Sequence, residues 1–209
     1  MLTGCVLITG TSRGIGLELT RQLLQRPSVT PKYIIATCRN PGEADDLMRL
    51  RDQYPETVIV KELDVTCYEK FPAFVEEIKK LTEGHGLGCL VNNAGVSPGQ
   101  TRFSSVTAEQ MADTFNVNVI APLMLTKALA KEMKYPDGAA ERFLLKKPLV
   151  VNMGSTLGSI EENDRGGVYP YRASKAALHM LTRYDRILLV KMNAALLLLS
   201  PSSGYQKVL

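Results

Sequence analysis

The chain has 209 residues, 45% of them hydrophobic and 22% charged, which is typical of a soluble globular protein with an adequate core. The net charge of +4 comes from basic residues scattered along the chain, so neither nucleic-acid nor membrane binding is indicated. No basic segment followed by a long apolar run precedes residue 6, so we expect a cytoplasmic protein without a signal peptide. We expect residues 1–209 to form one domain.

The first predicted element is a strand that begins near Val6 and leads into a glycine-rich turn. Gly10, Gly14 and Gly16 follow with the spacing Gly-x3-Gly-x-Gly, and leucines in residues 17–24 give the next helix one apolar face. Such a turn suits a phosphate, because glycines allow close backbone approach and a helix N-terminus attracts an anion. A turn that serves packing alone is the alternative.

The pattern continues as alternating strands and helices. We expect further strands at residues 33–37, 57–63, 89–92 and 149–153. We expect helices at residues 43–54 and 71–81, and from Thr107 towards residue 134 with a break at Pro122. Because parallel neighbours need crossover connections, this alternation predicts a parallel α/β sheet. We expect right-handed crossovers and the strand order 3-2-1-4-5.

Four cysteines are present, and none has a spacing typical of a metal site. Cys5 and Cys89 lie in apolar strand runs, where thiols act as small buried hydrophobes. We therefore expect four free thiols and no metal.

Five short segments follow the predicted strands: the glycine turn and residues 38–40, 64–65, 92–95 and 154–155. The C-terminal ends of parallel strands lie along one edge of a sheet, where such folds bind ligands. The sequence therefore predicts a nucleotide site at this edge.

These segments resemble motifs of the short-chain dehydrogenase/reductase family. The shared motifs are the Thr-Gly-x3-Gly-x-Gly turn, Asp64-Val65, Asn92-Asn93-Ala94-Gly95, Asn118, Ser155 and Tyr171-Arg172-Ala173-Ser174-Lys175. Residues 152–160 and the 16-residue interval from Ser155 to Tyr171 are similar to the sniffer and C-factor-type carbonyl reductases. The resemblance covers residues 2–183. It implies a Rossmann-type, doubly wound fold with three α/β/α layers.

The same resemblance implies reduction of a carbonyl by hydride transfer, which leaves charge on oxygen that must be stabilised and protonated. Tyr171 would be the acid/base, and Lys175, on the same helix face, would lower its pKa and hold the nicotinamide ribose. Ser155 would orient the carbonyl, and Asn118 would support a water relay to Lys175.

Three other side chains are possible candidates for a role in the site. Tyr169 has alanine rather than lysine four residues later, so we expect packing or a substrate contact. His179 lies one turn after Lys175 and is expected to be a helix-face residue rather than a catalyst. His85 lies in a glycine-rich loop, where we expect it to be solvated.

Charge at the end of the second strand bears on the cofactor. An acidic residue there would bind the ribose 2′-hydroxyl of NAD, whereas this chain has Arg39 there and Arg13 in the glycine turn. Two guanidinium groups suit a 2′-phosphate and favour NADP(H), unless either arginine points into solvent. Asp64 would hydrogen-bond the adenine. The other cofactor contacts implied by the resemblance are Gly10, Ser12, Gly14, Ile15, Gly16, Val65, Asn93, Ala94, Gly95, Tyr171 and Lys175.

The resemblance ends after Arg183, and residues 184–209 form a divergent tail that looks like a splice variant or an alternative reading of the last exon. Residues 194–199 stand where a sixth strand is expected. Pro201 stands in place of a turn proline, with Ser202 instead of the following glycine. We expect neither a substrate lid nor a seventh strand, and the altered tail bears on any homodimer formed through the catalytic helices.

Two functions fit this pattern. The first is an NADPH-dependent reductase of ketones or aldehydes. The second is a catalytically impaired isoform that binds NADP(H) or acts as a partner subunit. A nucleotide sensor without catalytic ancestry would leave Ser155, Tyr171 and Lys175 unexplained.

Overall fold

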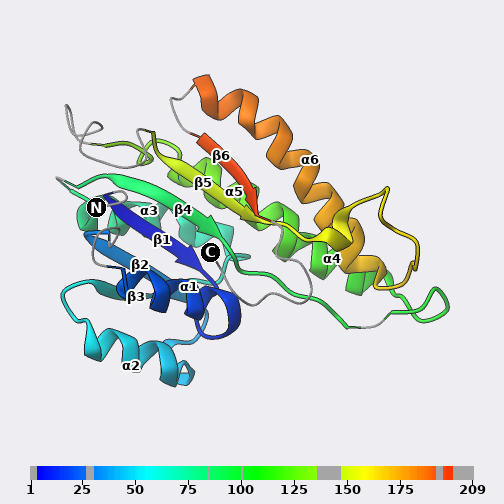
Figure 1. Cartoon of the computed structure of the whole chain (residues 1–209), viewed down its shortest axis with the longest axis horizontal. Coiled ribbons are helices and arrows are strands. Elements are labelled where there is room, and N and C mark those ends of the chain that lie inside the picture. Colours follow the sequence, from blue (N-terminus) through cyan, green and yellow to red (C-terminus); the bar gives the residue numbers. More distant parts are fainter. Residues whose placement is uncertain are drawn as a thin grey trace.

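The computed structural model describes residues 4–26, 31–83, 85–99, 101–135, 147–191 and 195–199. Within them, parallel strands form one sheet: β1 (Cys5–Thr9), β2 (Tyr33–Cys38), β3 (Val58–Glu62), β4 (Leu87–Asn92), β5 (Leu149–Met153) and β6 (Ala195–Leu199). Their order is β3-β2-β1-β4-β5-β6 (Figure 1). The predicted order is confirmed, and the sixth strand pairs with β5 over its whole length.

Helices connect these strands and cover the sheet. They are α1 (Gly14–Leu24), α2 (Asp45–Gln53), α3 (Phe71–Leu81), α4 (Ala108–Phe115), α5 (Ala121–Leu129) and α6 (Tyr169–Lys191). In Figure 1, α6 lies beside α4 and α5, and α1 and α2 lie at the other end of the sheet. No helix of the described residues has both the length and the apolar character needed to cross a membrane.

Both faces of the sheet are buried. Val6 and Ile8 of β1 pack in one core cluster with Leu47 of α2, whereas Leu7 packs in a second cluster with Leu125 of α5. Successive side chains of a strand point to opposite faces, so this alternation places helices on both sides. The result is the three-layer, Rossmann-type arrangement that the sequence predicts.

The helix that follows Thr107 differs from the prediction. It does not break at Pro122 but widens just before it, in a π-helix, η3 (Asn116–Ile120), where the Ala121 N–H donates to the carbonyl of Asn116. Proline has no N–H and its ring crowds the preceding turn, so a wider turn lets the helix continue. The helix ends at Leu129 rather than near residue 134.

Other boundaries shift by a few residues. The helix expected over residues 43–54 divides into a 3-10 turn, η1 (Pro41–Glu43), and α2, because Ala44 between them has non-helical backbone angles. The expected strand at residues 89–92 begins earlier, at Leu87, whereas the bounds of α3 and β5 are confirmed. Pro201 and Ser202 lie outside the described residues.

The four cysteines are free, as predicted. Burial raises the pKa of the Cys5 thiol to about 11 and that of Cys89 to about 12, so both remain protonated hydrophobes at neutral pH.

Candidate functional site

The glycine turn between β1 and α1 depends on two close approaches. Gly10 has φ +69°, and a Cβ there would lie 2.8 Å from the Ala94 Cα. A Cβ at Gly16 would lie 2.4 Å from the Gly10 carbonyl oxygen. Gly14 has φ +61° but faces open space. Only glycine satisfies these backbone conditions together, so the turn leaves room for a ligand above α1.

Side-chain hydrogen bonds fasten this turn to the end of β4. Thr9 Oγ1 accepts the N–H groups of Asn93 and Ala94, both at 3.0 Å. The Asn93 side-chain amide donates to the carbonyls of Thr9 and Gly10, at 2.8 and 3.0 Å. The Asn93 side chain therefore holds the glycine turn, and the Thr9 hydroxyl holds the backbone at the end of β4. The sequence analysis did not select Thr9, although it begins the Thr-Gly turn.

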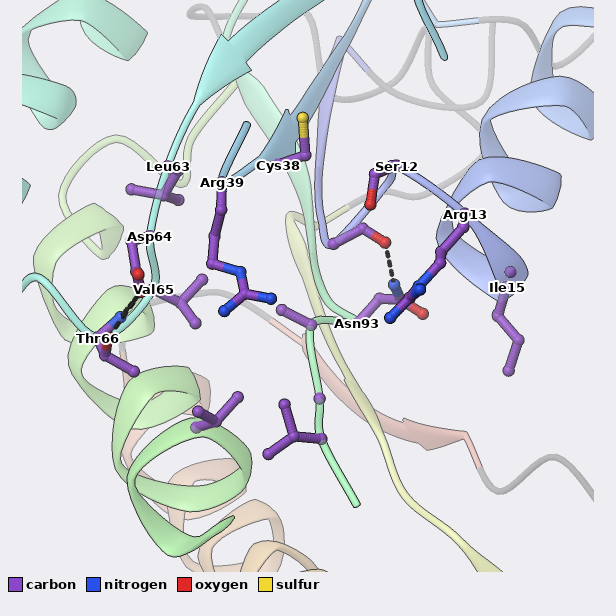
Figure 2. A pocket seen from close by; sticks show the side chains of 16 residues that line it. Ser12, Arg13, Ile15, Cys38, Arg39, Leu63, Asp64, Val65, Thr66 and Asn93 are labelled. Carbon is purple, nitrogen blue, oxygen red and sulfur yellow. Dashed lines mark hydrogen bonds between the residues drawn. The ribbon is translucent and has the colours of Figure 1, made fainter. Parts of the chain in front are cut away.

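A pocket of about 380 Å³ lies at this edge of the sheet (Figure 2). It brings together Gly10, Ser12, Arg13, Gly14, Ile15, Arg39, Asp64, Val65, Asn93, Ala94 and Gly95, along with Cys38, Leu63, Thr66, Val96 and Val117. Gly16 does not line it, because it packs beneath the turn, and neither do Tyr171 and Lys175.

The rim of this pocket is positively charged. Arg13 and Arg39 are both exposed and both line it, and within the described chain neither forms an ion pair. In Figure 2 the Arg39 guanidinium is turned into the pocket. An adjoining hollow of about 540 Å³ also contains both arginines, together with Ser12, Asn40 and Arg49 and the carboxylates of Glu43, Asp45 and Asp46. This arrangement can bind a phosphate group.

Asp64 lies at the end of β3 opposite Arg39. Its Oδ1 accepts the backbone N–H of Thr66 at 2.9 Å and the Thr66 hydroxyl at 2.7 Å. Burial by itself raises the pKa of Asp64, but these hydrogen bonds and the charges of Arg39 and Lys70 outweigh burial and lower it. Asp64 is therefore an ionised acceptor in the pocket wall.

Lys175 lies beneath the far end of the pocket. Its ammonium donates to the Met153 carbonyl at 2.6 Å and lies 5.5 Å from the centroid of the Tyr171 ring. Burial lowers the pKa of Lys175 to about 8. A Cβ at Gly95 would lie 3.9 Å from Lys175 Nζ, so the pocket wall and the lysine meet at Gly95.

Asn118 is buried in the π-helix and its side chain is fully engaged. Its Oδ1 accepts the Val96 N–H at 2.9 Å, and its amide donates to the Val96 carbonyl at 2.9 Å and to Ser174 Oγ at 3.0 Å. Ser174 in turn donates to the Tyr171 carbonyl at 2.8 Å. Asn118 therefore fastens α6 to the chain that follows β4.

Ser155 follows β5 and begins a 3-10 turn, η5 (Thr156–Gly158). Its Oγ accepts the Leu157 N–H at 3.2 Å, which leaves the hydroxyl proton available to an external acceptor. Its backbone N–H donates to His179 Nε2 at 3.3 Å. The sequence analysis assigned His179 only to a helix face; its position one turn after Lys175 was the available signal.

The two remaining candidates have structural contacts. Tyr169 donates its N–H to Thr101 Oγ1 at 2.9 Å, and its ring lies 6.2 Å from that of Phe103, consistent with packing. The expectation that His85 is solvated was wrong. It is half-buried, because its ring packs edge-on against Tyr33, with centroids 5.7 Å apart.

Comparisons with known proteins agree with this geometry. The sequence profile of the short chain dehydrogenase family matches residues 4–196. The FixR protein of Bradyrhizobium diazoefficiens is 32% identical over 185 residues, which are 85% of this chain but only 59% of FixR. The carbonyl reductase Sniffer of D. melanogaster superposes with a TM-score of 0.87 and 33% identity, covering 95% of this chain and 80% of that one. An NADPH-bound carbonyl reductase from chicken fatty liver gives a TM-score of 0.86 and 32% identity, covering 96% and 80%.

Proposed function

Because this chain belongs to the short chain dehydrogenase family, we propose that it is an oxidoreductase that uses NADPH to reduce a ketone or aldehyde to an alcohol. The observation that carries this proposal is the meeting of two features at Gly95. On one side is the glycine-turn pocket with its two arginines, which form no ion pair among the described residues. On the other is the buried Lys175 ammonium facing Tyr171. The solved neighbours with carbonyl reductase in their titles support the proposed substrate class.

The pocket residues fit a dinucleotide phosphate. The turn approaches the ligand through backbone alone, and the α1 N-terminus supplies free N–H groups for a pyrophosphate. Arg13 and Arg39 would hold the 2′-phosphate, and Asp64 the adenine. Bound NADPH would supply the hydride that reduces the carbonyl carbon.

The residues beneath the pocket would stabilise and protonate the product. The Ser155 hydroxyl donates a hydrogen bond to the substrate oxygen, which orients the carbonyl and disperses its developing negative charge. Tyr171 transfers its phenolic proton to that oxygen, completing the alcohol. The Lys175 ammonium stabilises the phenolate that remains.

Asn118 would support proton return to Lys175 through its backbone rather than its side chain. Its side-chain amide is engaged by Val96 and Ser174. Its carbonyl has two acceptor positions, and residue 122, which would donate to it in an α-helix, is Pro122 and has no N–H. We therefore assign the water relay of this proposal to the Asn118 carbonyl.

A second function is a chain that binds NADP(H) without turnover, or that serves as a partner subunit. The observation that favours it is that neither Tyr171 nor Lys175 lines the nucleotide pocket. The nucleotide pocket lies within the matched part, so cofactor binding does not distinguish the two functions.

The deciding experiment is NADPH oxidation by the purified chain against a panel of ketones and aldehydes, with NADPH affinity measured by calorimetry on the same sample. The first function predicts turnover that the Tyr171→Phe variant loses while it still binds NADPH. Binding without turnover would instead establish the second function. Absence of binding would contradict both.

We also propose that two copies pair through α6. Met180 is 67% exposed on this helix, so its side chain is available to such a contact. Sedimentation of the full chain should show a dimer, and Met180→Glu should shift it towards monomer. A wild-type monomer would contradict this pairing.

A further inference from the structure

His179 joins the helix that carries Tyr171 and Lys175 to the turn that carries Ser155. It lies four residues after Lys175, so both side chains project from the same side of α6. Its Nε2 lies 3.3 Å from the backbone nitrogen of Ser155 and accepts that N–H. The Ser155 backbone, rather than its hydroxyl, is therefore the part of the serine that this histidine holds.

The contact is enforced by a close approach at Gly158. A Cβ there would lie 2.8 Å from His179 Cε1 and 2.8 Å from the Lys175 carbonyl carbon. The Gly158 N–H also donates to the Ser155 carbonyl at 2.9 Å, which closes the turn on itself. The turn thus rests directly on α6, with the imidazole against its underside.

The hydrogen bond requires a neutral ring. A nitrogen that accepts an N–H carries no proton, so the neutral ring holds its proton on Nδ1. Burial and the nearby Lys175 ammonium lower the pKa of His179 and keep the ring neutral at pH 7. The other charged residues of its own helix are Arg172, Arg183, Asp185, Arg186 and Lys191. The α4 helix, which also packs on α6, carries Glu109 and Asp113, whereas the η5 turn and β6 contain no titratable residue.

We propose that His179 is a positioning residue of the active site, whose neutral imidazole holds the Ser155 backbone so that the serine hydroxyl points at the substrate carbonyl. The role of Ser155 in this proposal rests on the proposed function. The contact between His179 and Ser155 does not depend on it. On protonation, the imidazolium has only donors, so it releases the Ser155 N–H and repels Lys175.

The first arm of the test is NMR on the full chain, and it needs no activity. The chain has two histidines, so the His85→Gln variant leaves His179 as the single imidazole signal. We expect an unprotonated Nε2 at pH 7.5 and a pKa below the ordinary 6.5. The Ser155 amide shift should titrate together with the ring. A protonated Nε2 at pH 7.5, or a Ser155 amide that ignores the titration, would overturn the proposal.

The second arm compares two substitutions at the same position. His179→Leu removes the acceptor, and we expect kcat to fall about tenfold while the NADPH Kd stays within about twofold. His179→Gln places an amide oxygen near the former Nε2 and should restore kcat to within about threefold of wild type. It should also remove the decline in kcat that the wild type shows on acidification.

His85→Gln is the matched control, because it deletes the other histidine far from Ser155 in the sequence, and it should leave kcat and its pH profile unchanged. Equal losses in His179→Leu and His179→Gln would indicate a purely structural role and overturn the proposal. If no carbonyl is reduced by the wild type, the proposed function fails and the NMR arm alone decides the His179 contact.

Discussion

The nucleotide side and the carbonyl side of this site are built differently. On the nucleotide side, strand ends and the glycine turn are held by hydrogen bonds among Thr9, Gly10 and Asn93, which lie in or next to the sheet. On the carbonyl side, loops bring exposed apolar side chains such as Phe103, 82% exposed, and Ile160, 88% exposed. The residues of the nucleotide side are positioned by the register of the sheet, whereas these apolar side chains of the carbonyl side are positioned by loops.

The two sides also differ in backbone strain. Gly166, Gly167 and Val168 form a left-handed run before α6, and a β-branched residue at φ 49° costs about 1 kcal/mol or more. The nucleotide turn uses glycine at its left-handed positions and avoids that cost. The proposed cofactor site is therefore built from unstrained backbone, whereas the proposed substrate side includes a strained loop.

The largest expected effect separates chemistry from cofactor binding. Tyr171→Phe should lower kcat about 10³-fold, because it removes the proton donor, while NADPH affinity changes less than about threefold. Steady-state kinetics and calorimetry on one preparation measure both. Tyr169→Phe is the matched control, two residues away, and should retain kcat within about threefold. Comparable losses in the two variants would refute the assignment of Tyr171.

The next effect tests the packing of the nucleotide side. Gly16→Ala should destabilise the fold by about 3 kcal/mol, because its Cβ would lie 2.4 Å from the Gly10 oxygen. Gly14→Ala meets open space and should cost only about 1 kcal/mol for its positive φ. Urea denaturation measures both. Alanine ordinarily stabilises a helix relative to glycine, so a more stable Gly16→Ala would contradict the close approach.

A smaller effect concerns the 2′-phosphate. Arg39→Ala should weaken NADPH binding about 30-fold, or about 2 kcal/mol, because it removes charged hydrogen bonds, and leave NADH binding unchanged. Arg49→Ala is the control, since Arg49 lines the same hollow but is paired with Asp46 at 2.9 Å. It should change NADPH affinity less than about twofold. Equal loss of NADPH and NADH affinity in Arg39→Ala would argue against phosphate selectivity.

The smallest effect is a gain in stability on the carbonyl side. Burial lowers the pKa of Lys175 from 10.5 to about 8, and at neutral pH this shift corresponds to about 3 kcal/mol of native-state destabilisation. Lys175→Met removes that cost but leaves the Met153 carbonyl without its donor. The ligand-free variant should therefore be more stable by about 1 kcal/mol at pH 7.

The sign of this effect can be checked against pH. Between pH 8 and 10.5 the unfolded chain binds more protons at Lys175 than the native chain does, so wild-type stability rises with pH across this window. The advantage of Lys175→Met should be complete below pH 8, vanish within this window and become a deficit by pH 10.5, where nothing offsets the lost hydrogen bond to the Met153 carbonyl. An advantage that does not depend on pH would show that the lysine charge is not its cause.

The sheet and the outline of the nucleotide pocket could be predicted because each depends on local pattern. Each apolar run, such as β1 or β5, consists of adjacent residues, and Gly10, Gly14 and Gly16 lie within a few positions of one another. The C-terminal ends of parallel strands then had to share one edge. Arg39 and Asp64 entered the pocket by that rule alone, with no knowledge of their contacts.

What the sequence by itself determined is therefore the alternation of strands with helices and the residue types at the strand ends, since both follow from periodicity and chain connectivity. Only the tertiary structure decided three contacts. The Asn93 amide donates to the glycine turn, and the Asn118 side chain hydrogen-bonds Val96 and Ser174. His179 accepts the Ser155 N–H. The physical reason is distance along the chain. The hydrogen bonds join residues 22 to 83 positions apart, and packing of the helices on the sheet determines which donor meets which acceptor.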